Sequence, residues 1–143
     1  MGNPDKGFAS LKKVTLFAVG CLLSLECGTI ERSKQLHTQA RLHNVIAAIR
    51  ELVHENGRLP SSEQLKRRVG EKMWGDGWGR EFEYGSFIKD GEEYYVAASL
   101  GRDGIRDVDQ LSDYIGSPKE SVQGSFDRDI VAVNGRFVRD AGK

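Results

Sequence analysis

The stretch GRDGIRDVDQLSD (residues 101–113) carries four aspartates: Asp103, Asp107, Asp109 and Asp113. Carboxylates at this density suit three uses: a cage for a hard cation such as calcium, a general acid and base pair, or the solvated surface of an ordinary loop. The spacing is not that of an EF-hand, which needs acidic residues at loop positions 1, 3 and 5 and a glycine at position 6. The spacing alone leaves all three uses open.

Catalysis would need a second chemical group beside the carboxylates, and no motif in the chain supplies one. The sequence has no HExxH, no GxSxG and no phosphate-binding loop, and both of its cysteines lie in one apolar run near the N-terminus. The 21 basic residues balance the 21 acidic ones, which is not the strongly basic composition of a nucleic-acid binder. We therefore predict a protein that is not an enzyme and does not bind nucleic acid.

An apolar run, Val14–Ile30, follows Lys12 and Lys13. As a helix it would span roughly 25 Å, slightly less than a hydrocarbon core of about 30 Å. The preceding lysines favour a cytoplasmic N-terminus. The pattern predicts a cytoplasmic leader at residues 1–13, a membrane anchor or cleaved signal segment at residues 14–30, and an extracytoplasmic domain at residues 31–143.

Cys21 offers a second kind of anchor. The residues AVGC that end at Cys21 resemble the small-residue signature before the lipid-modified cysteine of bacterial lipoproteins. The other cysteine, Cys27, lies in the same run, so residues 31–143 contain no disulfide. Lipidation at Cys21 is therefore an alternative to a transmembrane helix as the membrane anchor.

Helical periodicity continues beyond the apolar run as far as Gly57, which suits the left-handed position after a helix, and Pro60, which cannot continue one. Ser61 and Gln64 form a capping-box pattern, which predicts a short second helix through about Val69. The apolar residues of the first helix recur at i, i+3 and i+4 spacings: Leu36, Ala40, Leu42, Val45, Ile46, Ile49, Leu52 and Val53.

From residue 74 onward the sequence favours strands. We expect them near residues 81–88, 93–99, 130–133 and 136–138, with a helical turn in DQLSDYIG between the second and the third. The dipeptides Asp90-Gly91 and Asn134-Gly135 suit type I′ turns and predict two antiparallel hairpins. Helices followed by strands indicate an α+β domain, in which the long helix packs on a small antiparallel sheet. The expected sheet residues of the core are Phe82, Tyr84, Tyr95 and Phe137.

Four segments in this order resemble the major pseudopilin of the type II secretion system: HNVIAAIRELVHENGRLPSSEQL, GWGREFEY, YYVAASLGRDG and DRDIV. The resemblance covers roughly residues 43–130. The corresponding family motifs are a helix ending in an NGRYPT type turn, a DPWGNPYQY type segment, an SLGADG loop and a closing DDI type motif. The resemblance implies a pilin-like fold, with a helix that is half membrane anchor and half amphipathic.

The N-terminus resembles a prepilin leader in an atypical form. Gly7 precedes Phe8 as at a prepilin cleavage site, but the fifth residue after the cut is Lys12, where the family has glutamate. A lysine there would add like charge, whereas the glutamate is thought to compensate the terminal amine of a neighbouring subunit.

The resemblance also implies a calcium site in the loop after Ser99. Carried over by motif, its ligands would be the carbonyl of Leu100 and the carboxylates of Asp103, Asp127 and Asp129. Because calcium takes about six to eight oxygens, Asp107 or Asp109 would complete the shell. Residues 105–126 form a longer insertion than the family has at this point.

The function implied by the resemblance is that of a non-enzymatic subunit of a secretion fibre. Such a subunit lies in the bacterial cytoplasmic membrane with its globular part in the periplasm, and it assembles with its own copies or with other pseudopilins. The alternative is a solitary membrane-anchored or lipidated binding module that uses the same fold without polymerising. Cleavage after Gly7 favours the fibre, and lipidation at Cys21 favours the solitary module.

Overall fold

The computed structural model describes residues 8–142, and for residues 8–26 it describes the backbone only. The chain divides into two units, Met1–Glu31 and Arg32–Lys143. The predicted anchor at residues 14–30 falls mainly on residues whose side chains lie outside this description. Among the described residues, no helix combines the length and the apolarity needed to cross a membrane.

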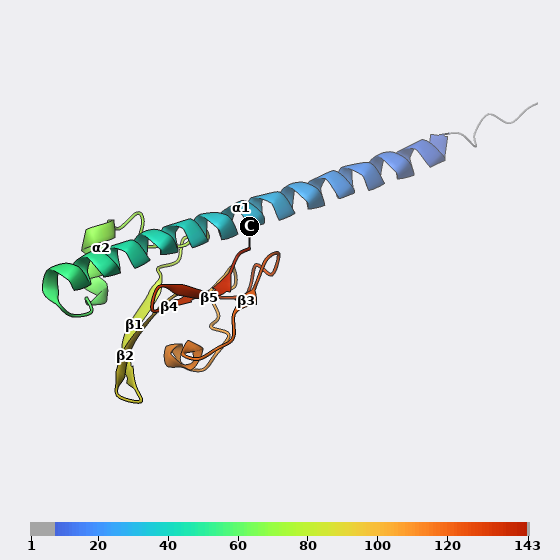
Figure 1. Cartoon of the computed structure of the whole chain (residues 1–143). Coiled ribbons are helices and arrows are strands. Elements are labelled where there is room, and N and C mark those ends of the chain that lie inside the picture. Colours follow the sequence, from blue (N-terminus) through green and yellow to red (C-terminus); the bar gives the residue numbers. More distant parts are fainter. Residues whose placement is uncertain (1–7, 143) are drawn as a thin grey trace, which may run out of the picture. The chain divides into compact units, whose positions relative to one another are not determined.

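The second unit is an α+β fold in which a long helix packs on a five-stranded, mostly antiparallel sheet (Figure 1). The strand order is β1-β2-β4-β5-β3, and only β3 pairs in parallel, with β5. The elements are α1 (Phe8–Asn56), α2 (Ser62–Val69), β1 (Glu83–Lys89), β2 (Glu92–Ser99), the 3₁₀ turn η1 (Leu111–Tyr114), β3 (Glu120–Ser121), β4 (Ile130–Val133) and β5 (Arg136–Asp140). The predicted α+β class is confirmed. The sequence analysis missed β3, which is too short to show a period.

Local sequence signals set the ends of the helices as predicted. Gly57 has φ 69° and donates its N–H to the carbonyl of Val53 at 2.8 Å, which ends α1. At the start of α2, the Ser61 hydroxyl accepts from the N–H of Gln64, and the Gln64 side chain accepts from the N–H of Ser61. Each group satisfies a backbone donor that the first turn of α2 leaves unpaired.

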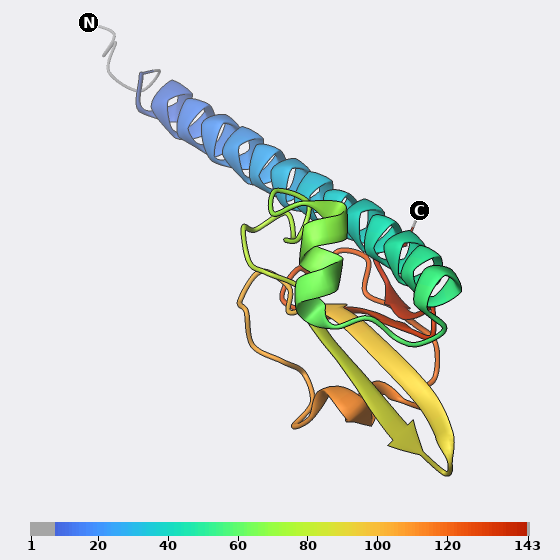
Figure 2. The same ribbon diagram turned by 90° about the vertical axis from the view of Figure 1, so that its left-hand side faces the viewer.

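Both predicted hairpins are present. Asp90 and Gly91 join β1 to β2 with φ values of 53° and 81°, and Asn134 and Gly135 join β4 to β5 with 47° and 77°. Positive φ at both central residues matches the right-handed twist of the flanking strands. Figure 2 shows the β1–β2 hairpin as the longest part of the sheet.

One face of the sheet packs against α1. Leu42, Val45, Ile49 and Leu52 of the helix are buried in one core with Phe82, Tyr95, Ala97 and Ile130, and Tyr84 and Phe137 pack against it. All four residues predicted for the core are thus in contact with it, although Phe82 lies just before β1 and not within the sheet.

The predicted burial of Leu36 and Ala40, at the start of the apolar stripe of α1, is wrong. Leu36 and Ala40 are exposed, and the buried positions belong to the polar residues Gln35 and Thr38. Gln35 donates to the carbonyl of Val122 at 2.8 Å. Thr38 accepts from the N–H of Gly77 at 2.8 Å and donates to the carbonyl of Lys34 at 2.8 Å. Polar residues fit here because this part of α1 meets loop backbone, whose polar groups need partners.

The other face of the sheet has a core of its own. Val96, Ala98 and Val131 are buried there with Tyr114 and Ile115 from the loop between β2 and β4. In Figure 1, this loop, with η1 in orange, lies on the side of the sheet opposite α1. The helical turn predicted in DQLSDYIG is η1, and it serves to cover the sheet.

The burial of α1 predicts different costs for one substitution at two positions of the same helix. Leu42→Ala should lower the free energy of unfolding by about 2–5 kcal/mol, because Leu42 is 0% exposed and its loss leaves a cavity. Leu36→Ala is the matched control, and it should cost less than about 1 kcal/mol because Leu36 is 40% exposed. Denaturant unfolding of both variants measures the difference, and equal losses would contradict the assignment of faces.

Candidate functional site

The aspartate loop starts and ends at two paired strands. β2 ends at Ser99 and β4 begins at Ile130, and these two residues are partners in the sheet. The pairing brings the two ends of the loop together, and the N–H of Arg102 donates to the carbonyl of Phe126 at 2.7 Å. Leu100, half-buried, and Asp129, buried, therefore lie at the same end of the sheet.

Asp127 and Asp103 already have partners from within the loop. Both carboxylate oxygens of Asp127 accept from the guanidinium of Arg102, each at 2.8 Å. This pairing lowers the pKa of Asp127 below its usual value. The exposed Asp103 accepts from the N–H of Ile105 at 2.9 Å and so closes a local turn.

Asp107 collects three hydrogen bonds on a single oxygen. Its Oδ2 accepts from Nε of Arg128 at 2.9 Å, from Nη1 of Arg139 at 2.6 Å and from the N–H of Asp129 at 3.0 Å. The side chains of Asp107 and Arg139 are 22% and 15% exposed. This pair is therefore less screened by water than an ordinary surface ion pair.

Asp129 is the buried member of the cluster. Its Oδ2 accepts from the N–H of Asp107 at 3.0 Å and from the hydroxyl of Tyr114. Its Oδ1 is buried and has no hydrogen-bond partner among the described residues. Burial raises the pKa of Asp129, and the hydrogen bond from Tyr114 opposes that shift. The guanidinium of Arg139 lies 5.2 Å from the centre of the Tyr114 ring.

The predicted calcium ligands do not come together as a ligand set. No group of three or more His, Cys, Asp or Glu residues in the described part of the chain is placed to hold a metal ion. The exposed Asp109 enters the cluster through its carbonyl, which accepts from Arg106 at 3.1 Å. Calcium needs about six to eight oxygens, and here guanidinium groups hold the carboxylates of Asp107 and Asp127. As they are paired here, these carboxylates do not form a calcium ligand set, and calcium binding by this loop stays a prediction.

The predicted processing and lipidation residues lie outside this geometry. Gly7 is outside the described residues, and the side chains of Phe8 and Cys21 are likewise not described. Cleavage after Gly7 and lipidation at Cys21 therefore stay predictions.

The sequence analysis missed a buried aspartate, Asp76. Its Oδ1 accepts from the N–H groups of Trp78 and Arg80, each at 2.9 Å, and its Oδ2 accepts from the hydroxyl of Ser99 at 2.9 Å. Asp76 thus joins the segment before β1 to the end of β2, and its role is structural. Its sequence signal is the pair of glycines that flanks it, since Asp-Gly segments favour turns in which the carboxylate caps nearby N–H groups.

The outward side of α1 is the second candidate site. Between residues 33 and 47 its exposed residues are Ser33, Leu36, His37, Ala40, His43, Asn44 and Ala47. None of them is an acid, a lysine or an arginine, although 29% of the chain is charged. Solvent-facing sides of helices normally carry charges, so this surface, called the uncharged α1 face below, is suited to a contact.

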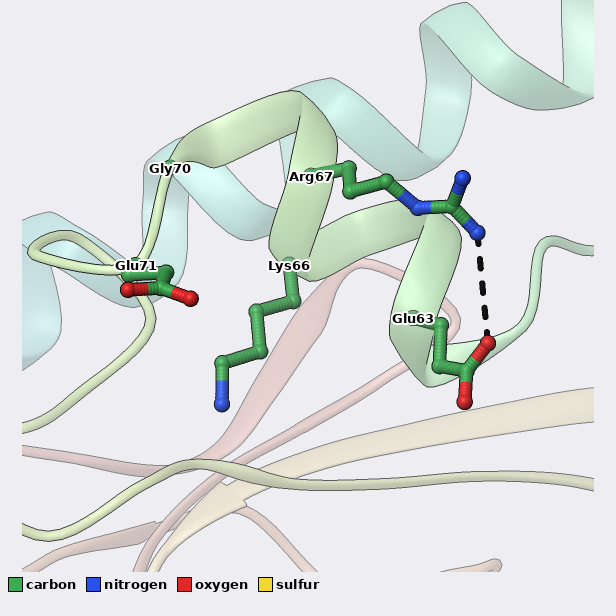
Figure 3. Close-up of a pocket in the computed structure, with 5 residues that line it drawn as sticks. All are labelled: Glu63, Lys66, Arg67, Gly70 and Glu71. Carbon is green, nitrogen blue, oxygen red and sulfur yellow. Dashed lines mark ion pairs between the residues drawn. The ribbon is translucent and has the colours of Figure 1, made fainter.

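A surface hollow on α2 is a weaker candidate (Figure 3). Arg67 points toward Glu63 at 3.9 Å, and Lys66 points to another side of the helix and pairs with Glu81. The hollow mixes two basic residues with Glu63 and Glu71, so it selects neither an anion nor a cation.

The three bonds to Asp76 predict a large cost for its removal. Asp76→Ala should lower the free energy of unfolding by about 2–4 kcal/mol, because it leaves the buried Ser99 hydroxyl and two N–H groups without their acceptor. Asp109→Ala, at an exposed carboxylate, is the control and should change stability by less than about 0.5 kcal/mol. If Asp76→Ala lowers the free energy of unfolding by no more than Asp109→Ala does, the structural role of Asp76 is wrong.

Comparisons of the chain with models of protein families, with curated proteins and with solved structures found no match.

Proposed function

We propose that the chain is a non-enzymatic, pseudopilin-like subunit that assembles through its N-terminal helix in a secretion fibre at the bacterial cytoplasmic membrane. The observation that carries the proposal is the uncharged α1 face. It lies on the helix that, further toward the N-terminus, contains the apolar run predicted to enter the membrane.

The spacing of small residues on this face suits another helix. Ser33, Ala40 and Ala47 follow one another at intervals of seven residues. At about 100° per residue, each is rotated around the axis of α1 by only roughly 20° from the one before, so the three lie nearly in line. Small residues in a line let two helix backbones approach closely. Leu36 lies between Ser33 and Ala40 at a spacing that would flank such a contact, whereas the ring of His43 packs against Phe137 of β5, 4.8 Å between ring centres, at the border of this face.

The partner that we propose is α1 of a second copy or of a related subunit. A membrane anchor would hold neighbouring copies side by side with the same orientation to the membrane, so that α1 of one copy can run parallel to α1 of the next and present the uncharged α1 face to it. In the second unit, the acidic loop directs its carboxylates to arginines of the same chain, which supports a structural use over a catalytic one.

The alternative, a solitary lipidated or membrane-anchored binding module, has two supporting observations in the sequence. Lys12 stands where the resemblance expects a glutamate, and the residues AVGC precede a cysteine that could carry a lipid. Both observations concern the N-terminal segment, so an experiment on assembly separates the two functions.

Ala40→Glu tests assembly through the uncharged α1 face. In membranes that contain the full chain, this variant should reduce cross-linked multimers by at least about tenfold, because packing would bury an unpaired carboxylate. Its melting temperature should stay near that of the wild type, since residue 40 is exposed. Chemical cross-linking followed by gel analysis measures the effect.

His54→Glu is the matched control, because it places the same charge at an exposed position of α1 beyond the uncharged face. It should leave the multimers unchanged. Multimers that persist in Ala40→Glu at the wild-type level, or a wild type with no multimers, would contradict the fibre and favour the solitary module.

A further inference from the structure

We infer that an arginine–carboxylate network holds the loop between β2 and β4 in place and that the fold needs no calcium. The network consists of Arg102, Arg106, Arg128 and Arg139 with Asp107, Asp127, Glu83 and Glu120. Asp129 joins it through the N–H of Asp107, which donates to its carboxylate. The inference rests on the contacts of this loop and is independent of the proposed function.

Two neighbouring residues of the loop contact strands that are far apart in the strand order of the sheet, β1 and β5. Arg106 makes two hydrogen bonds to Glu83 of the edge strand β1, at 2.9 and 2.8 Å. Asp107, the next residue, pairs with Arg139 of β5 at 2.6 Å. Because β1 and β5 are separated by two strands, this dipeptide fastens the loop across the sheet.

Two further arginines complete the network where the two ends of the loop meet: Arg102 near its start and Arg128 near its end. Arg128 pairs with Asp107 at 2.9 Å and with Glu120 of β3 at 3.2 Å, and Arg139 lies 3.4 Å from Glu120. Arg102 binds both oxygens of Asp127. Planar guanidinium groups suit such bidentate contacts with carboxylates, and they carry charge at every relevant pH.

The network performs the tasks that a bound cation would perform in such a loop. It neutralises carboxylates that the chain brings together, and it joins segments that are distant in sequence. Calcium would have to displace Arg102 from Asp127 and enter a cluster where four guanidinium groups already supply positive charge. The buried Oδ1 of Asp129 remains uncommitted among the described residues, but one oxygen is far from a shell of six to eight.

The polar network is joined to the apolar core beneath it. The guanidinium of Arg139 lies over the ring of Tyr114, and the hydroxyl of Tyr114 donates to the buried Asp129. The backbone N–H groups of Asp107 and Asp129 each donate to the carboxylate of the other, both at 3.0 Å. Loss of Arg139 would therefore loosen the loop and the core that the loop covers.

The test is thermal unfolding of the full chain in detergent micelles, with calcium at about 10 mM or with a chelator. Extracellular calcium modules bind with Kd values of about 0.1–1 mM, so a calcium site would raise the melting temperature by several degrees. We expect a calcium-specific shift of less than about 1 °C, and a rise of several degrees would overturn the inference.

Arg139→Met supplies the second arm. It should lower the melting temperature by about 5 °C or more, because it removes a partly buried partner of Asp107. Arg136→Met, at an exposed residue of the same strand, is the matched control and should shift it by less than about 1 °C. Equal shifts in the two variants would overturn the inference.

A third variant covers the case in which Arg139→Met does not fold. Arg102→Met removes the more exposed pair with Asp127, and it should still fold, with a melting temperature lower by about 1–3 °C. A melting temperature of Arg102→Met equal to that of the wild type would overturn the role of this pair in the network.

Discussion

The strand β2, which lies between β1 and β4, sets the constraint on which the rest of the second unit depends. Its residues from Tyr95 to Ser99 are all buried, and because successive side chains of a strand point to opposite faces, both faces of the sheet must be covered. Residues of α1 cover one face. The loop between β2 and β4 covers the other, with η1 placing Tyr114 against Val96 and Val131. Loss of either cover would expose apolar surface to water, at a cost of about 25 cal/mol for each Å².

This constraint also explains the charge pattern of the loop. A loop that must lie across a sheet brings its carboxylates close to one another and to the protein interior, where an unpaired charge is costly. Asp107 is compensated by Arg128 of the loop and Arg139 of β5, and Asp129 accepts from the N–H of Asp107 and the hydroxyl of Tyr114. The aspartates therefore belong to a loop that covers one face of the sheet. Of the three uses considered from the sequence, this is closest to the solvated loop, but with arginines of the same chain as partners.

Local chemistry made much of the fold predictable, and long-range pairing made the rest unpredictable. The end of α1 at Gly57, the cap at Ser61 and both hairpins depend on neighbouring residues, and they were confirmed. The start of the buried side of α1 was predicted wrongly because the polar Gln35 is buried there. Its acceptor, the carbonyl of Val122, lies 87 residues away in the sequence. The pair between Asp107 and Arg139 spans 32 residues, so the aspartates could be recognised as a cluster but their partners could not. Asp76 had a local signal in its flanking glycines, but its burial depends on Ser99, which lies 23 residues away at the end of β2.

One side of α1 packs on the sheet, and the uncharged α1 face is exposed. In the proposed assembly, this face contacts a second subunit. The mature N-terminus of the membrane-extracted protein tests the assembly account most directly, because a fibre subunit and a lipidated module are processed at different residues. Intact-mass and N-terminal peptide mass spectrometry should find a chain that begins at Phe8 and carries no lipid on Cys21. A chain that begins with a lipid-modified Cys21, or one that retains Met1, would contradict the fibre and leave the solitary module as the function of this fold.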